Sequence, residues 1–294
     1  AGWVRLDRGE SVFATRKRLK GIRIMTGAID EQIYREMEEY GSQGWAIIDG
    51  LVPDKMFDEI AAACRRVKAK VRAGEVDVYT HYGDPGEPWC IRGLIAPDFA
   101  EPVFADFLLY APFIARARAY LGQELRLGWI DLRTNTHNED LPGGWHRDIG
   151  GKDLDPETEL GIIRKPMKNL RWYLALIDDD CLQIVPRSQH RPRTEEERRV
   201  LNDAPHDDIT GQEIIRVKAG QVIFWDGNTL HRGNMKKDVE RLTLAASWQK
   251  YSEDDPVAEK VDGRFEWRLK DEVRAALPEG LHAYYDRWRA LQPA

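Results

Sequence analysis

The sequence has no hydrophobic run close to the ~20 apolar residues that a membrane-spanning helix needs. Its amino-terminal segment is polar and rich in arginine, without the apolar stretch of a signal peptide. Only three cysteines, Cys64, Cys90 and Cys181, occur in 294 residues, and no two of them have Cys-x-x-Cys spacing. Scattered cysteines argue against a disulfide framework and a zinc ribbon and are typical of a reducing compartment. We therefore expect a soluble, cytoplasmic protein with free thiols.

An excess of positive charge is also missing. The chain has 44 Lys and Arg against 50 Asp and Glu, so its formal net charge is −6. No global basic field is present to attract nucleic acid or an anionic membrane, and we expect neither as a partner. A small-molecule substrate is the expected partner, while the oligomeric state is not readable from these features. The length fits one large domain over 1–294 with a substantial core.

Helical patterns dominate the two ends of the chain. Apolar spacing, proline starts and glycine stops predict a helical amino-terminal part over about 1–122, interrupted by one short strand at 45–48. A helical tail is predicted over about 251–294. The helices are expected at 30–40, 53–71, 112–121, 265–276 and 282–291.

Short strands separated by Gly, Pro and Asp turns fill the middle, about 125–250. This succession favours a mainly β fold with flanking helices, whose core is a double-stranded β-helix, the cupin-like jelly roll that often holds a metal in its mouth. The strands are expected at Leu125–Thr136, Trp145–Ile149, Leu170–Ile177, Leu182–Val185, Ile214–Val217, Gln221–Trp225 and Arg241–Gln249.

His146 and Asp148 are the most informative pair in the chain. Residues two apart on a strand point to the same side, so an imidazole and a carboxylate with this spacing can hold one ion. A third ligand must come from elsewhere, and His231 supplies it. Two histidines and one carboxylate on one face of an octahedral ion are typical of non-haem Fe(II) oxygenases, whose opposite face stays open for chemistry.

Ten positions after His231, Arg241 begins a strand with one polar face. A buried arginine needs an anionic partner, and its planar fork suits a carboxylate bound through two hydrogen bonds. The distal carboxylate of 2-oxoglutarate would satisfy Arg241. The alternation predicts that Arg241, Thr243, Ala245 and Ser247 lie on one side and Leu242, Leu244 and Trp248 on the other.

Together these motifs resemble the phytanoyl-CoA dioxygenase family of Fe(II)/2-oxoglutarate-dependent oxygenases. The resemblance is carried by His146-Arg147-Asp148, by Val185–His190, by His231-Arg232-Gly233 and by Arg241. It implies a jelly-roll core and iron bound by the two histidines and the aspartate. It also implies O₂ as oxidant and 2-oxoglutarate as co-substrate, with the co-substrate carboxylate on the arginine.

The chain departs from the family pattern in three loops. The family's Pro-Gly-Ser-His turn is here Pro186-Arg187-Ser188-Gln189-His190, the preceding Asn-Gly loop is Asp178–Cys181, and Gly-Asp before the distal histidine strand is Gly220-Gln221. None of these changes touches a predicted metal ligand. Related halogenases have a small residue in place of Asp148, so the intact carboxylate favours hydroxylation over halogenation.

Further contacts are predicted from strand position. Thr243 shares the face of Arg241, and Asn135 and Trp172 lie on strands expected to approach the co-substrate. Arg171, in a basic group, and His190, in the turn motif, are the candidate substrate contacts. The long connections 150–168 and 187–212 are candidate lids, and Arg147 should point away from the metal.

The predicted reaction is hydroxylation of an unactivated C–H bond in a small or medium organic molecule, with release of succinate and CO₂. The same iron chemistry diverted to desaturation, cyclisation or epoxidation remains an alternative, because these outcomes depend on substrate placement. A non-catalytic cupin-like binding module and a zinc hydrolase are the alternatives from other classes. Arg241 argues against a passive module, which needs no carboxylate clamp beside its metal.

Overall fold

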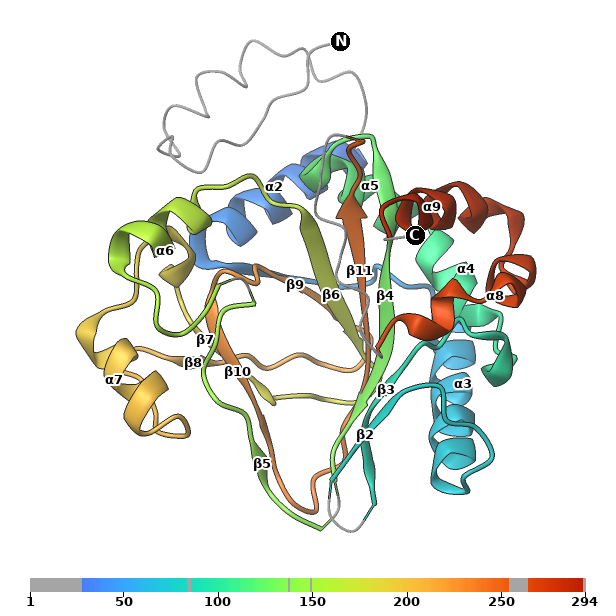
Figure 1. Ribbon diagram of the computed structural model, residues 1–294, viewed down its shortest axis with the longest axis horizontal. Coiled ribbons are helices and arrows are strands. Elements are labelled where there is room, and N and C mark those ends of the chain that lie inside the picture. Colours follow the sequence, from blue (N-terminus) through green and yellow to red (C-terminus); the bar gives the residue numbers. More distant parts are fainter. Residues whose placement is uncertain (1–27, 84–85, 137, 149, 254–263, 293–294) are drawn as a thin grey trace.

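The chain forms two antiparallel sheets with helices packed around them. The computed structural model describes residues 28–83, 86–136, 138–148, 150–253 and 264–292. One sheet has seven strands in the order β1-β9-β6-β11-β4-β3-β2, and the other has four in the order β5-β10-β7-β8 (Figure 1). The strands are β1 Trp45–Ile48, β2 Thr80–Tyr82, β3 Pro88–Arg92, β4 Leu125–Thr134, β5 Leu141–Pro142, β6 Asn169–Ala175, β7 Leu182–Val185, β8 Glu213–Ile214, β9 Val222–Trp225, β10 Leu230–Met235 and β11 Leu242–Lys250.

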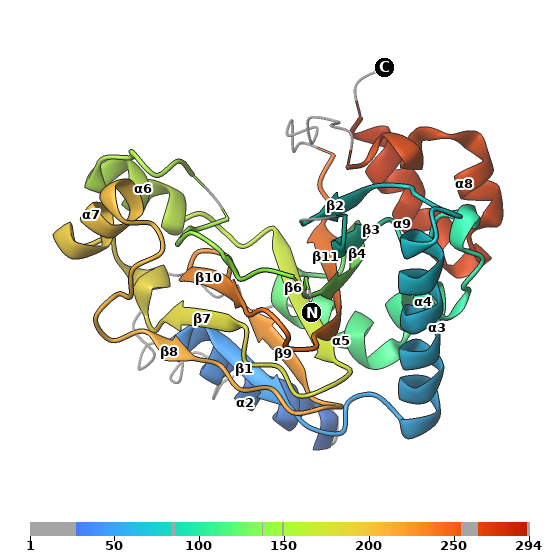
Figure 2. The same cartoon turned by 90° about the horizontal axis from the view of Figure 1, so that it is seen from below.

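The large sheet has an inner face, toward the small sheet, and an outer face, toward the helices (Figure 2). Strand alternation divides the side chains between them. Tyr173 and Ala245 belong to the cluster between the sheets, which also contains Ile184 of the small sheet. Trp172 and Leu244, their sequence neighbours, belong to the larger core under the helices. The predicted two-sided pattern of the strand after Arg241 is thus confirmed.

Helices cover the outer face and the ends of the sheets. Figure 2 shows α3, α4, α8 and α9 on the outer side of the large sheet, and α6 and α7 beside the small sheet. Helix α5 contacts β6 and β11, and α9 contacts β4. The α-helices are α2 Ala28–Gln43, α3 Asp54–Arg72, α4 Val103–Leu109, α5 Ala111–Leu121, α6 Pro156–Ile163, α7 Glu195–Asp203, α8 Asp271–Ala276 and α9 Glu279–Ala290. The 3-10 helices are η1 Pro97–Phe99, η2 Ser188–His190 and η3 Glu266–Leu269.

Most predicted elements are present, but the amino-terminal part is less helical than expected, because β2 and β3 extend the large sheet beyond β4. The predicted strand Trp145–Ile149 is wrong. Within its described residues only His146 makes a strand-like bridge, to His231, and the next pairing is Asp148 N–H to the carbonyl of Gly227 at 2.8 Å. The segment therefore presents both ligands without being a full strand.

Strand β10 and helices α6 and α7 were not predicted. The β10 sequence, Leu230–Met235, is mostly polar, so it lacks the apolar alternation that identifies a strand. Helices α6 and α7 lie inside the two predicted lid connections. Thr194 and Glu197 form a capping box at the start of α7, a local signal that the sequence offered.

Candidate metal centre

His146, Asp148 and His231 converge on one point at the mouth between the sheets. Each offers a ligand atom, and these atoms all lie within 4.8 Å of one another. His146 Nε2 lies 3.9 Å from Asp148 Oδ1, and His231 Nε2 lies 3.6 Å from Asp148 Oδ2. Reciprocal backbone hydrogen bonds of 3.0 Å between the two histidines fix their separation. The three residues predicted from the sequence are therefore brought together.

Both imidazoles are oriented for a ligand through Nε2. His146 Nδ1 lies 2.9 Å from the carbonyl of Gly144, and His231 Nδ1 lies 2.8 Å from the carbonyl of Thr229. A carbonyl only accepts, so each Nδ1 carries the proton and each Nε2 presents a lone pair. This outer-shell arrangement is the usual one for metal-bound histidine.

Burial and charge favour the ligand forms of two of these side chains. Burial lowers the pKa of His231 to about 4, which keeps the imidazole neutral at neutral pH. For Asp148, burial alone would raise the pKa. The positive charge of Arg171 is the largest opposing effect, and the net result is a pKa below the usual range, so the group stays ionised. His146 lies on the solvent-exposed side of the site, with its side chain 51% exposed.

Arg171 and Gly227 hold the carboxylate in place. Arg171, on the inner face of β6, donates from Nη1 to Asp148 Oδ2. Its guanidinium also lies 5.8 Å from the ring centroid of Trp225. A Cβ at Gly227 would come within 2.5 Å of Asp148 Oδ2 and 3.1 Å of Arg171, so only glycine fits there. Arg171, predicted as a substrate contact, is thus committed to the metal-site carboxylate.

Arg147 points away from the ligands, as predicted, and anchors the segment that carries them. Its Nε lies 3.0 Å from Glu159 of α6, and its Nη1 donates to the carbonyls of Ser188 and Asn228. Ser188 in turn accepts from the N–H of Leu230 at the start of β10. This buried arginine therefore connects helix α6 to the segments on both sides of the metal centre.

Arg241 has a protein partner that the sequence did not predict. Its Nε donates to Asp179 Oδ1 at 2.8 Å, and its Nη2 lies 3.5 Å from Asp179 Oδ2. Burial would lower the pKa of Arg241, but Asp179 outweighs this effect and the net shift is upward. Nη1 of Arg241 makes no hydrogen bond to any described residue. A run of three aspartates marked a turn in the sequence, but nothing indicated which one pairs with Arg241.

Thr243 lies next to Arg241 on the same inner face and is fully buried. Within the described part of the chain, its hydroxyl has no hydrogen-bond partner. A buried hydroxyl without a partner is costly, and such groups call for a ligand or another explanation. Arg241 and Thr243 together present donors to the space between the sheets.

Two predicted co-substrate contacts, Trp172 and Asn135, have other roles in the structure. Trp172 lies on the outer face, stacked on Phe113 with ring centroids 5.0 Å apart, because its neighbours Arg171 and Tyr173 take the inner face. Asn135 donates its amide to the carbonyls of Lys236 and Val239, so it braces the β10–β11 connection. Its remaining oxygen cannot donate to a carboxylate.

His190, predicted as a substrate contact, has a partner in helix α2. Its Nε2 is 2.7 Å from the carbonyl of Gly41 in helix α2. The turn before it nonetheless keeps the shape that the family's glycine allows, since Arg187 adopts φ 63°.

Comparison with known proteins fits this geometry. No curated protein sequence matches the chain. A family model described as phytanoyl-CoA dioxygenase (PhyH) matches residues 40–237. The chain belongs to the phytanoyl-CoA dioxygenase family. Arg241 lies just beyond the matched residues.

Solved structures show a similar fold at low sequence identity. EctD from S. alaskensis, crystallised with 2-oxoglutarate and 5-hydroxyectoine, is 19% identical over 74% of this chain and 76% of that chain, with a TM-score of 0.56. The epimerase SnoN, in complex with Fe3+, alpha ketoglutarate and nogalamycin RO, is 18% identical over 76% and 85%, with a TM-score of 0.52. EvdMO1 is 17% identical over 75% of this chain, with a TM-score of 0.56, and the chain spans only 50% of its length.

These findings confirm the predicted family, the mainly β jelly-roll fold and the enzyme class of non-haem iron oxygenases. The prediction of iron and 2-oxoglutarate agrees with this family and with the donor set of the site. Among the described residues, no helix is both long and apolar enough to cross a membrane. The three cysteines are buried and free, as expected.

Proposed function

We propose that this protein uses Fe(II), O₂ and 2-oxoglutarate to hydroxylate an unactivated C–H bond of a small or medium organic molecule. The convergence of His146, Asp148 and His231, with both Nε2 atoms facing the carboxylate, is the observation that carries this proposal. Two imidazoles and one carboxylate fit Fe(II) and leave three coordination positions on the opposite face.

The protein binds the iron and the co-substrate and orients the groups around them. When bound, the iron and O₂ supply the oxidising chemistry, in which 2-oxoglutarate loses CO₂ to become succinate. Arg171 neutralises the Asp148 oxygen that faces it and holds the carboxylate in one orientation. The aromatic ring of Trp225 and the buried cluster around Tyr173 keep water from the inner end of the site.

Arg241 and Thr243 are the proposed anchor for the distal carboxylate of 2-oxoglutarate. Asp179 takes Nε and one edge of the guanidinium, so the carboxylate would bind at Nη1 and accept a further hydrogen bond from the Thr243 hydroxyl. The unpartnered buried hydroxyl supports this proposal, because a bound carboxylate oxygen would give it an acceptor. Asp179 would then orient the arginine.

Hydroxylation is the proposed outcome because the site retains an aspartate as its third ligand. A carboxylate in this position leaves no vacant ligand site for chloride, unlike the small residue of related halogenases. The neighbour SnoN is described as an epimerase. The type of reaction in such a site depends on how the substrate lies against the metal. The single-domain organisation over 1–294 and the cytoplasmic location stay predictions.

The test is a metal and co-substrate titration followed by turnover. Anaerobic calorimetry with Mn(II) and then 2-oxoglutarate should show two successive saturable binding events, and Fe(II) with O₂ should yield succinate. Asp148→Ala should lose both metal binding and succinate formation, while Asp178→Ala, on an exposed turn, should retain both. Succinate formation by the Asp148→Ala variant at the wild-type rate would rule out this metal site.

A further inference from the structure

The inner face of the large sheet carries an excess of positive charge beside the metal centre. Arg171 pairs with Asp148, and Arg241 pairs with Asp179, one cation to one anion each. Among the described residues, Asp131 is a further acid on this face, and two arginines share it.

Arg92 and Arg133, the arginine pair, both contact the same oxygen of Asp131. Arg92 Nη1 lies 2.7 Å from Oδ2, whereas Arg133 Nη2 lies 3.4 Å from it. Asp131 is almost fully buried, and the side chain of Arg133 is 23% exposed. This contact with Asp131 is the one ion pair of Arg133 within the described ranges. One carboxylate therefore neutralises two guanidinium groups, and a net positive charge remains.

Register places the arginine pair on the side that faces the metal. Arg133 lies opposite Thr243 of β11 and Cys90 of β3, and directly opposed residues share a face. Arg92 lies opposite Asp131 in the same way. The charge of Arg133 also contributes to the lowered pKa of Asp148, so the two groups are within electrostatic reach.

Neighbouring groups leave donors available. Arg92 Nε donates to His81 Nε2 at 3.1 Å, so the His81 proton is on Nδ1. Burial lowers the pKa of His81, and the nearby arginines lower it further, which keeps it neutral. The face thus offers the guanidinium of Arg133 and a neutral imidazole donor, and Asp131 is the one carboxylate paired with Arg92 or Arg133 among the described residues.

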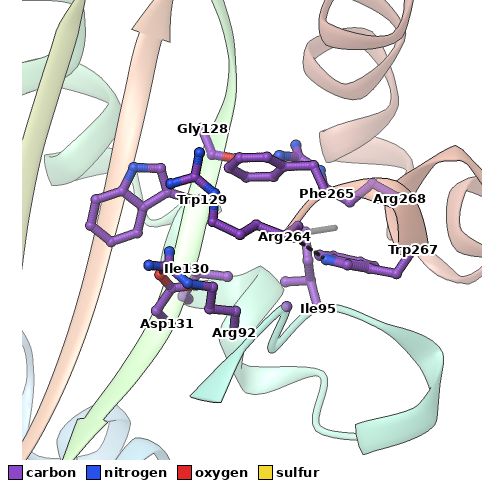
Figure 3. Close-up of a pocket in the computed structure, with 11 residues that line it drawn as sticks. Arg92, Ile95, Gly128, Trp129, Ile130, Asp131, Arg264, Phe265, Trp267 and Arg268 are labelled. Atoms are coloured by element: carbon purple, nitrogen blue, oxygen red, sulfur yellow. Dashed lines mark hydrogen bonds and ion pairs between the residues drawn. The ribbon is translucent and has the colours of Figure 1, made fainter. Parts of the chain in front are cut away.

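A small, partly open hollow adjoins Arg92 and Asp131. Arg92 and Asp131 line one side, Trp129 projects from β4, and Phe265 and Trp267 close the other side from the carboxy-terminal segment (Figure 3). Aromatic walls beside a cationic group suit an organic anion with an apolar or planar portion.

We propose that the substrate carries an anionic group, a carboxylate or a phosphate, which binds Arg133 and Arg92 while its carbon skeleton contacts the aromatic wall. This inference rests on the proposed function, because it takes the nearby metal centre as the place of reaction. The pair would set the direction in which a substrate extends from the metal. It follows that neutral sugars and hydrocarbons are poor substrates.

The experiment measures binding of matched probes to the full-length protein loaded with Mn(II) and saturating 2-oxoglutarate. The probes are 3-phenylpropanoate, phenyl phosphate and the neutral 3-phenylpropanamide. Both anions should bind saturably, and the amide should bind at least about tenfold more weakly. Arg133→Gln should weaken the binding of both anions about tenfold without a matching change for the amide. Arg133→Lys keeps the charge but not the planar fork, so its anion affinity should lie between those of Arg133→Gln and the wild type.

Arg118→Gln, on the exposed surface of α5, is the matched control and should bind every probe like the wild type. Equal binding of anions and amide, unchanged anion binding by Arg133→Gln, or no anion binding at all overturns the proposal. So does an equal loss of 2-oxoglutarate affinity in Arg133→Gln, because the pair would then serve the co-substrate. Titrating the anions without metal and 2-oxoglutarate separates the two proposals: a protein that binds the anions through Arg133 but not 2-oxoglutarate contradicts only the proposed function.

Discussion

The two faces of the seven-stranded sheet are built from the same strands and differ in almost every side chain. On β6, Trp172 is buried under the helices while Arg171 holds the metal-site carboxylate. On β4 and β11, Leu132 and Leu244 enter the helical core, whereas Thr243 faces the small sheet. Because side chains alternate along each strand, a residue that packs in the helical core is followed directly by one that faces the site.

Substitutions on the two faces should therefore have different effects. Substitutions on the outer face should lower the free energy of unfolding and leave ligand affinities nearly unchanged. Substitutions on the inner face should change binding or turnover with a small effect on stability. The four predictions below test this division, beginning with the largest expected effect.

Asp148→Ala is expected to have the largest effect. The carboxylate is one of three candidate ligands, and its loss leaves Arg171 without its partner. We expect succinate formation to fall by at least about a thousandfold, since removal of a metal ligand removes the reaction itself. Turnover with Fe(II) and the melting temperature should be measured together. If unfolding at the assay temperature accounted for the whole fall in activity, the expectation that inner-face substitutions act mainly on turnover would be wrong.

Trp172→Ala is the matching change on the outer face. Trp172 is fully buried and stacks on Phe113. Removing this ring leaves a large cavity, so the free energy of unfolding should fall by about 3–5 kcal/mol. At a temperature where the variant is still folded, its affinity for Mn(II) and 2-oxoglutarate should match the wild type. A selective loss of 2-oxoglutarate binding in the folded variant would restore the earlier interpretation of Trp172 as a co-substrate contact.

Arg241→Gln tests the proposed anchor at the inner end of the site. Loss of a charged donor to a carboxylate should raise the dissociation constant for 2-oxoglutarate about 30- to 100-fold. Asp179→Asn is its counterpart, because it removes a negative charge beside the proposed carboxylate position while keeping the shape. That variant should bind 2-oxoglutarate more tightly than the wild type. Weaker binding in both variants would indicate that the intact ion pair, not the free edge of Arg241, is what matters.

The metal centre was predictable because its signal is local and chemical. His146 and Asp148 are two apart, which is the spacing of the family's His-x-Asp motif. The faces of β11 followed from the same period of two. Such patterns need no knowledge of which strands are neighbours.

The partners across the fold could not be predicted in this way. The pairing of Arg241 with Asp179, and of Arg147 with Glu159, joins residues whose proximity depends on the tertiary fold. Trp172 was misassigned because residues 170–177 are nearly all apolar, so alternation did not reveal which face was inner. Strand β10 was missed for the opposite reason, since its polar side chains serve the site and do not form a core.

Thr243→Val gives the smallest effect and the most specific one, because its two consequences have opposite signs. The hydroxyl is buried and, among the described residues, has no partner, so the isosteric valine should raise the stability of the ligand-free protein by about 1 kcal/mol. If the hydroxyl donates to bound 2-oxoglutarate, the same change should raise the dissociation constant about fivefold. Thermal unfolding with and without 2-oxoglutarate and Mn(II) measures both effects in one protein. A more stable variant with unchanged affinity would mean that the co-substrate does not reach this part of the inner face, and Arg241 would then have to act without it.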